Sequence, residues 1–331
     1  HFAREYFFIR VWAAPATLSL MALKGWFIGM QDTVTPMITD IVVNVVNMVV
    51  SYVLAVYTPM GALGVALGTV VAQFTGLSLA IILLLCKYRH VFRGLSIWQL
   101  ARDMQGMRSL ITLNANLFVR SLCFMIVYVG FTSLSSLYGD TDLAVCSILM
   151  KLFMLVSYFV DGFAYAGEAL VGKYIGEAKS NPISDSPSGR PISNSPSGAS
   201  EISSLVRLLF LWSLGVGAVF TVLFALSYMP MYRMMTSDSE VLARLTDFVG
   251  WLIAMPIVST LAFMWDGVFT GATAGKHIRN AMIWAAIGFV VGYVATYHFL
   301  GTHALFVGYF LHLAARVIYL TATWRPLNTK L

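Results

Sequence analysis

Three acidic residues and one arginine lie inside long apolar stretches of the sequence. Asp161 and Glu168 share one stretch, Asp266 lies in another, and Arg120 lies in a third. A charged side chain at the centre of a bilayer costs roughly 2.5–3.5 kcal/mol on insertion scales, so such residues face a protein interior and usually have a partner or a function. These four residues are therefore the first candidates for binding a proton or a cation within a membrane.

Depth and spacing indicate how these groups pair. At about 1.5 Å of rise per residue, Arg120 lies roughly 17 Å into its stretch and Asp161 roughly 27 Å into a longer one, so both fall near mid-membrane. We therefore predict an Arg120–Asp161 ion pair, which has either a functional role or only a packing role. Glu168 follows Asp161 by two helical turns and shares its face. It is expected either to take up a proton or to pair with Lys173 at the helix end.

Uncharged polar residues accompany these groups. Asn114 and Asn116 precede Arg120 in the same apolar stretch. They are expected to line the same protein interior as Arg120. Asp40, Asn44 and Asn47 are spaced i, i+4 and i+7, which places them on one helical face. This polar stripe is expected either to form interhelical hydrogen bonds or to line a substrate path.

The composition indicates that the apolar stretches are membrane helices. Of the 331 residues, 59% are hydrophobic and 11% are charged, whereas a soluble domain carries about 25% charged residues. A spanning helix needs about 20 apolar residues, and about nine stretches satisfy that length. They cover residues 6–30, 37–57, 61–86, 109–137, 143–172, 204–228, 243–271, 279–300 and 303–323. The predicted fold class is an all-α, polytopic integral membrane helix bundle.

Most basic residues fall in alternate loops between these spans, and therefore on one membrane face. That face carries Lys87, Arg89, Arg93, Arg102, Arg108, Lys173, Lys179, Arg190, Arg207, Lys276, Arg279, Arg325 and Lys330, and the other has little beyond Arg4 and Arg233. Basic loops stay in the cytoplasm, so we predict a plasma-membrane (inner-membrane) protein with a cytoplasmic C-terminus. The net charge of +6 thus reflects membrane orientation and not binding to nucleic acid.

An internal repeat divides the chain. Aligning residue n with n + 242, without a gap, matches Gly25 with Gly267, Phe27 with Phe269, Gly29 with Gly271, Val49 with Val291, Ala62 with Ala304, Leu63 with Leu305, Val65 with Val307 and Ala72 with Ala314. The copies are six spans apart, so they have the same orientation, as in transporters with two parallel halves. The first half shows only its last three spans, so about three preceding helices are expected to be missing.

The repeat gives the expected domain organisation. Residues 1–86 form the last three helices of an N-terminal bundle, 87–108 form a cytoplasmic connection, and 109–331 form a six-helix C-terminal bundle. Within the latter, residues 182–199 contain a tandem repeat, PISDSPSGR followed by PISNSPSGA. A segment rich in Pro, Ser and Gly has no apolar face to bury, which predicts a disordered cytoplasmic loop.

The sequence carries no enzyme signature. The six histidines and three cysteines show no metal-ligand spacing such as HExxH, and there is neither a nucleophile elbow nor a phosphate-binding loop. We therefore expect no catalytic residue, no metal site and no cofactor. A polytopic membrane enzyme remains an alternative, which activity with a soluble acyl or prenyl donor would support.

Three stretches resemble the multidrug and toxic compound extrusion (MATE) family, and within it the DinF-like branch. They are KGWFIGMQDTVTPMITDIVVNVVNMVVSY followed by GALGVALGTVVAQ; NANLFVRSLCF together with DGFAYAGEALVGKYIGEAK; and DGVFTGATAGKHIRNAM. In combination they are fairly specific to this family. The resemblance covers nearly the whole chain apart from the insertion rich in Pro and Ser.

The resemblance implies twelve helices in two six-helix halves around a central cleft. It also implies export of small organic, cationic or drug-like compounds by alternating access, in exchange for H⁺ or Na⁺, by a monomer in the lipid bilayer. Asp161 and Asp266 stand at acidic positions of the family, but the seventh helix carries Arg120 and no acid, which favours H⁺ over Na⁺. A flippase for lipid-linked intermediates, from the same superfamily, is the alternative within this architecture.

Overall fold

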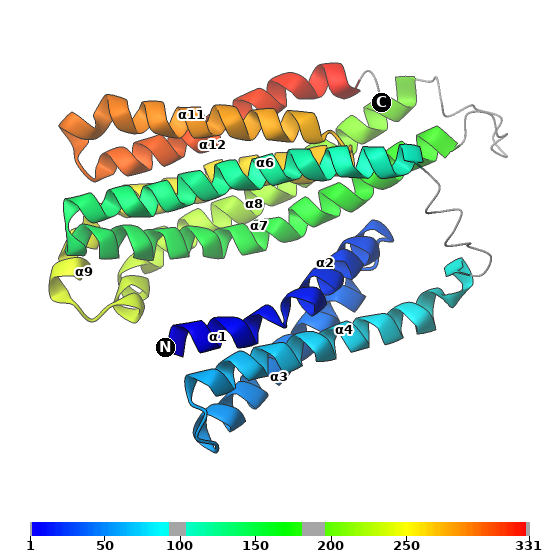
Figure 1. Ribbon diagram of the computed structural model, residues 1–331. Helices are drawn as coiled ribbons and strands as arrows, with labels where there is room; N and C mark the ends of the chain where they lie inside the picture. The colour runs from blue at the N-terminus through cyan, green and yellow to red at the C-terminus, as the bar shows by residue number, and fades with distance from the viewer. Residues whose placement is uncertain (1, 93–103, 181–195, 329–331) are drawn as a thin grey trace. The chain divides into compact units, whose positions relative to one another are not determined.

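The computed structural model describes residues 2–92, 104–180 and 196–328. Within these ranges the chain forms helices and no strand (Figure 1). Eight of the described helices are long and apolar enough to cross a membrane, and a bent helix pair near the N-terminus raises the number among these residues to nine if it is one span. The predicted all-α, polytopic membrane bundle of about nine spans is confirmed.

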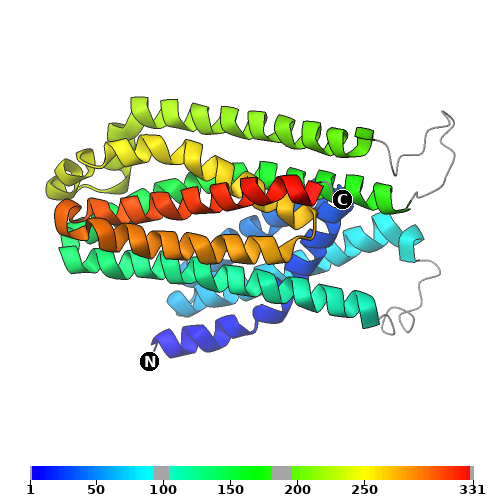
Figure 2. The same cartoon turned by 90° about the horizontal axis from the view of Figure 1, so that it is seen from above.

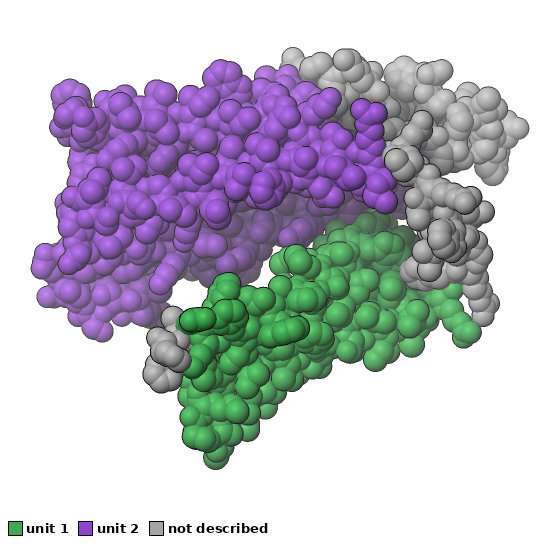
Figure 3. All heavy atoms as spheres, in the orientation of Figure 1, with its two compact units in different colours: residues 1–104 green, residues 105–331 purple. Residues whose placement is uncertain are grey.

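The chain divides into two compact units, His1–Met104 and Gln105–Leu331 (Figure 3). Unit 1 consists of α1 (Phe2–Val11), α2 (Ala14–Gly29), α3 (Val34–Val56) and α4 (Ala62–Phe92). The predicted span 6–30 is broken between α1 and α2, which meet at 46°. Pro15 lies in the first turn of α2, and its ring prevents the preceding residues from continuing a straight helix.

Unit 2 contains the longer helices. They are α6 (Met104–Ser135), which a 3₁₀ turn (Ser136–Tyr138) follows, α7 (Asp140–Ser180), α8 (Pro196–Met235), α9 (Ser239–Thr246), α10 (Val249–Gly271), α11 (Gly275–Leu300) and α12 (His303–Asn328). In Figures 1 and 2, α11 and α12 form an antiparallel hairpin, and α8 runs along one edge of the unit in Figure 2. Figure 1 shows α9 at one end of the unit, where it caps the bundle.

Two predicted loop boundaries need correction. The connection at 87–108 is shorter than predicted, because α4 continues to Phe92 and α6 begins at Met104. The predicted disordered loop at 182–199 is wrong for its last four residues, which open α8. Pro196 is the first residue of that helix, a position where proline is favoured because its fixed φ suits the helix and its missing N–H is not needed. Residues 182–195 lie outside the described residues.

The internal repeat extends to backbone geometry. Gln31 and Thr273, which are 242 residues apart, have positive φ angles of 60° and 53°. In each turn the next residue donates its backbone N–H to the carbonyl oxygen five residues earlier. Asp32 donates to Phe27 and Ala274 donates to Phe269, both at 2.9 Å. Positive φ is uncommon outside glycine, so its recurrence at the same repeat position shows that both units build the same turn before α3 and α11.

Candidate functional site

A charged cavity lies among the helices of unit 2. It has a volume of about 340 Å³, and the charged residues that line it are Arg120, Asp161, Glu168, Asp266 and Arg316. They come from α6, α7, α10 and α12. All five lie within helices that are long and apolar enough to span a membrane. The four elements therefore bring three carboxyl groups and two guanidinium groups together inside the membrane.

Asp266 is the centre of this charged group. Arg316 donates from Nε to Asp266 Oδ1 at 3.0 Å and from Nη2 to Oδ2, which makes a bidentate pair. Arg120 Nη2 donates to the same Oδ2. The side chain of Arg316 is 2% exposed and that of Asp266 is 8% exposed, whereas that of Arg120 is 31% exposed. The fully buried guanidinium thus depends on Asp266 for its counter-charge.

Small residues hold α7 close to α10 and so place the acids of the two helices in one cavity. A Cβ at Gly267 would lie 2.1 Å from the carbonyl oxygen of Ala164, and one at Gly271 would lie 2.4 Å from that of Glu168. Only glycine fits at such a backbone contact. Because Gly267 follows Asp266, this close approach places Asp266 beside Asp161 and Glu168.

The predicted Arg120–Asp161 ion pair is wrong, because Arg120 pairs with Asp266 instead. Arg120 and Asp161 line the same cavity, but α10 packs against α7 and the Asp266 carboxylate is the one that reaches the guanidinium. Asp161 remains within electrostatic range of Asp266, Arg120 and Arg316. The alternative that Glu168 pairs with Lys173 is also wrong, since Lys173 lies 3.9 Å from Glu177. In the described part of the chain neither Asp161 nor Glu168 forms an ion pair.

Sequence reasoning missed Arg316. It lies in the middle of the apolar span His303–Trp324, so the rule that singled out Arg120 would have found it as well. His312, one turn earlier on α12, is also fully buried. Neither ring nitrogen of His312 has a hydrogen-bond partner within the described residues.

The predicted asparagines do not share the charged cavity. Asn116 is buried and accepts a hydrogen bond from Arg279 Nη1 at 2.9 Å, and it lines a different cavity near the start of α11. Asn114 is exposed. The prediction that these two residues line the same interior is therefore wrong. Side chains two positions apart on an α-helix point to different sides of it.

The polar stripe of α3 makes contacts within unit 1. Asn47 Nδ2 donates to Thr69 Oγ1 of α4 at 3.1 Å, which is the interhelical hydrogen bond that one of the two interpretations predicts. Asn44 Nδ2 instead donates to the backbone oxygen of Asp40 at 2.9 Å. Asp40 pairs with Lys24 of α2. The stripe thus ties α3 to both of its neighbours in unit 1.

Comparison with known proteins shows the family. No protein-family model matches the chain. DNA damage-inducible protein F of Escherichia coli K12 is 32% identical over 324 residues, which are 98% of this chain and 66% of that protein. The chain belongs to the MATE family, in its DinF-like branch.

Other MATE proteins resemble the chain along a similar range. Protein DETOXIFICATION 44 of Arabidopsis thaliana, a chloroplastic protein, is 23% identical over 98% of this chain and 57% of its own length. A mutant of the Vibrio cholerae MATE transporter VcmN shares the fold, with a TM-score of 0.80 at 16% identity over 98% of this chain and 68% of that structure. The chain spans between 46% and 66% of the length of the curated relatives it matches. It is a multi-pass membrane protein with the MATE fold.

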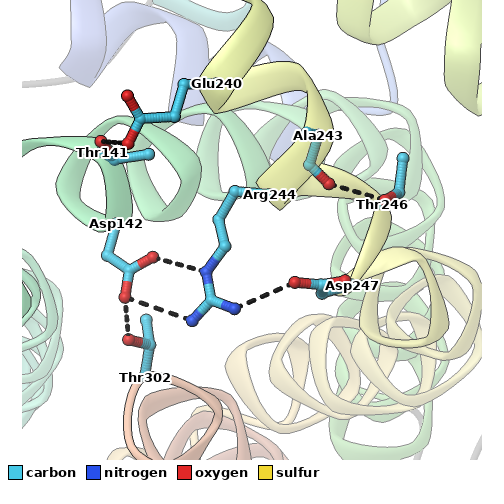
Figure 4. Close-up of polar contacts among 8 residues, drawn as sticks. All are labelled: Thr141, Asp142, Glu240, Ala243, Arg244, Thr246, Asp247 and Thr302. Atoms are coloured by element: carbon cyan, nitrogen blue, oxygen red, sulfur yellow. Dashed lines mark hydrogen bonds and ion pairs between the residues drawn. The ribbon is translucent and has the colours of Figure 1, made fainter.

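A second polar cluster joins three helices at the α9 end of this MATE unit (Figure 4). Arg244 of α9 donates to Asp142 of α7 at 2.9 Å and to Asp247 at 2.9 Å. Thr302, which precedes α12, donates to the same Asp142 carboxylate. Hydrogen bonding to Asp142 raises the pKa of Arg244 above its ordinary value and outweighs the opposing effect of burial. The guanidinium is therefore a permanent charge that fixes α9 to α7.

The turn before α3 in unit 1 is built around a buried carboxylate, that of Asp32. Its oxygens accept from Thr35 N at 3.2 Å, Thr35 Oγ1 at 2.6 Å, Lys87 Nζ at 2.7 Å and Tyr88 Oη at 3.0 Å. Burial by itself would raise the pKa of Asp32, but these four donors together lower it from 3.8 to about 2. An anion thus occupies the N-terminal end of α3, where the helix dipole favours negative charge.

We expect Asp32 to make unit 1 sensitive to acid below pH 4. Because the pKa of Asp32 falls on folding, its contribution to the free energy of unfolding is fully present above pH 3.8. That contribution is lost as the pH falls towards about 2. The difference in melting temperature between wild type and Asp32→Asn should be constant from pH 7 to about 5 and shrink below that. The readout is thermal unfolding in detergent micelles, with Thr35→Val as a control that keeps the carboxylate and removes one donor. A difference that does not change down to pH 2.5 would contradict this assignment.

Proposed function

We propose that the full-length protein exports small organic cations or drug-like compounds across the membrane in exchange for H⁺. One relative in this family is named Multidrug and toxin extrusion protein 1, and others are named as detoxification proteins. The observation that carries the proposal for this chain is the charged cavity of unit 2. There Asp161 and Glu168, for which the described residues supply no ion pair, lie beside a carboxylate that is already paired.

The roles of the three acids follow from their surroundings. Asp266 shares its two oxygens between two guanidinium groups, so it acts as a fixed anion. Asp161 and Glu168 line the cavity without such partners, and burial favours the protonated form of a carboxyl group. They are therefore the proposed coupling groups, which release and rebind protons when the cavity is open to opposite sides of the membrane in turn.

The charged cavity favours H⁺ over Na⁺ as the coupling ion. A sodium site needs several oxygen ligands, and here Arg120 and Arg316 take the place that a cation would occupy at Asp266. Within the described residues no group of three His, Cys, Asp or Glu side chains is arranged to hold a metal ion. We also propose that the protein is a monomer in the plasma membrane. Its basic membrane face and its C-terminus then lie in the cytoplasm.

Asp161→Asn tests the coupling role. In vesicles that contain the full-length protein, an imposed pH gradient should drive efflux of an organic cation dye. Asn mimics the protonated carboxyl group, so the variant should reach normal membrane yield and lose at least about tenfold in efflux rate, as expected when a proton-transfer group is removed. Asp140→Asn, an exposed position at the start of the same helix, is the matched control and should keep wild-type efflux.

The same vesicles separate the alternatives. Efflux that a sodium gradient drives and a pH gradient does not would contradict H⁺ coupling. Efflux that requires ATP and ignores both gradients would contradict secondary transport. If Asp161→Asn keeps both yield and efflux, Glu168 alone would remain as the coupling group in this cavity.

A further inference from the structure

A second cavity of unit 2, with a volume of about 660 Å³, lies at the turn between α10 and α11. Arg108 and Thr112 of α6 line one side of it, and Thr273, Gly275 and Lys276 line the other. Among the described residues that line it, none is acidic. Both cations are among the residues that we predict on the basic membrane face. The cavity is therefore electropositive and lies on the membrane face that we predict to be basic.

A third cation stands beside this cavity. Arg279 donates from Nη1 to Asn116 at 2.9 Å, and from Nε and Nη2 to Asn280 at 3.0 and 2.9 Å. These partners are neutral amides, and within the described part of the chain Arg279 forms no ion pair. Nδ1 of His277 is also buried without a hydrogen-bond partner there. The local positive charge is thus not neutralised by a described carboxylate.

The N-terminus of α11 adds backbone donors to the same cavity. The N-cap residue, Ala274, has no side chain that could accept a hydrogen bond. Among the described hydrogen bonds, none has the N–H group of Gly275 or Lys276 as its donor. The first N–H groups of a helix have no partner inside it and carry partial positive charge. Free N–H groups at a helix start are a common way of binding phosphate.

The internal repeat shows what is missing at this place. Ala274 is the repeat counterpart of Asp32, since 32 + 242 = 274, and the two turns have the same backbone geometry. In unit 1 the Asp32 carboxylate provides the anion at the helix start and binds Lys87. In unit 2 the carboxylate is absent, and the helix start lies beside two different cations, Arg108 and Lys276. The chain therefore supplies its own anion in one repeat and leaves the place for an external anion in the other.

We infer that this cavity binds a phosphate group, and that the head group of an anionic phospholipid supplies it. Basic pockets between membrane helices at the cytoplasmic side are typical sites for phospholipid head groups. Leu110, which also lines the cavity, is 58% exposed, and the adjacent Ile111 is 62% exposed. An acyl chain is therefore able to lie along α6 below a phosphate bound at Arg108 and Lys276.

The first test measures lipid-dependent stability and does not use transport. The full-length protein in detergent is titrated with phosphatidylglycerol, phosphatidylcholine or inorganic phosphate while its melting temperature is followed, and bound lipid is counted by native mass spectrometry. Phosphatidylglycerol should raise the melting temperature in a saturable way. Phosphatidylcholine and inorganic phosphate should change the melting temperature only slightly. The double variant Arg108→Gln, Lys276→Gln should raise the phosphatidylglycerol concentration at half-saturation about 30-fold. This factor corresponds to the loss of about 1 kcal/mol of binding free energy for each of the two cations. Lys173→Gln, an exposed lysine predicted on the same face, is the control and should not change it.

The second test restores the missing carboxylate. Ala274→Asp should raise the melting temperature without lipid and abolish the response to phosphatidylglycerol, because the new side chain occupies the place of the phosphate. Equal responses to phosphatidylglycerol and phosphatidylcholine, or a wild-type response from the double glutamine variant, would overturn the site. If inorganic phosphate matches phosphatidylglycerol at equal concentration and the double variant loses both responses, lipid is overturned as the source of the phosphate.

Discussion

Replacing Asp266 with asparagine is expected to lower the free energy of unfolding by about 3–5 kcal/mol, the range measured when one partner of a buried ion pair is removed. The reason is Arg316, whose side chain is 2% exposed and whose guanidinium bonds both oxygens of Asp266. Asparagine removes the negative charge and leaves a buried cation without a counter-ion. The measurement is unfolding in detergent micelles, together with membrane yield.

Second substitutions separate the two arginines. Adding Arg316→Gln to Asp266→Asn should recover most of the lost stability, because it removes the buried unpaired charge. Adding Arg120→Gln should recover much less, because the Arg120 side chain is 31% exposed and is able to reach water. Equal rescue by both would contradict this difference. Asp40→Asn, which removes an ion pair with an acid that is 49% exposed, is the control and should cost less than about 1 kcal/mol.

Gly267→Ala is expected to lower the free energy of unfolding by a similar amount, although it adds only one methyl group. Its Cβ would lie 2.1 Å from the carbonyl oxygen and 2.7 Å from the Cα of Ala164, so α10 has to move away from α7. Overpacking typically costs 1–3 kcal/mol, and contact with rigid backbone places this site at about 3 kcal/mol or more. The shift also moves Asp266 relative to Asp161, so gradient-driven dye efflux should fall with stability.

Gly250→Ala on the same helix is the matched control for this prediction. A Cβ at that position meets no atom within 4 Å, and alanine is favoured over glycine in a helix by up to about 1 kcal/mol. The control should therefore be neutral or stabilising. Comparable melting temperatures for the two alanine variants would show that the contact between α7 and α10 tolerates separation.

Composition and periodicity were sufficient to predict the membrane bundle and the approximate spans. Apolar length decides whether a helix crosses a bilayer, and this property is local in the sequence. The same rule identified Arg120, Asp161, Glu168 and Asp266 as buried charged residues, and it would have identified Arg316. The repeat at n + 242 was also visible, because glycines and apolar residues such as Gly25 and Gly267 recur at the same spacing in both halves.

Pairing inside the unit was decided only by tertiary structure. Depth along each helix follows from residue counting, but the rotation of a helix about its axis and its choice of neighbour depend on packing. Gly267 and Gly271 let α10 contact α7 at the backbone, which brought Asp266, and not Asp161, to Arg120. For the same reason Asn116 faces Arg279 and not the charged cavity. The anion missing at Ala274 became visible only once its turn showed the positive φ angle and the hydrogen bond of the Asp32 turn.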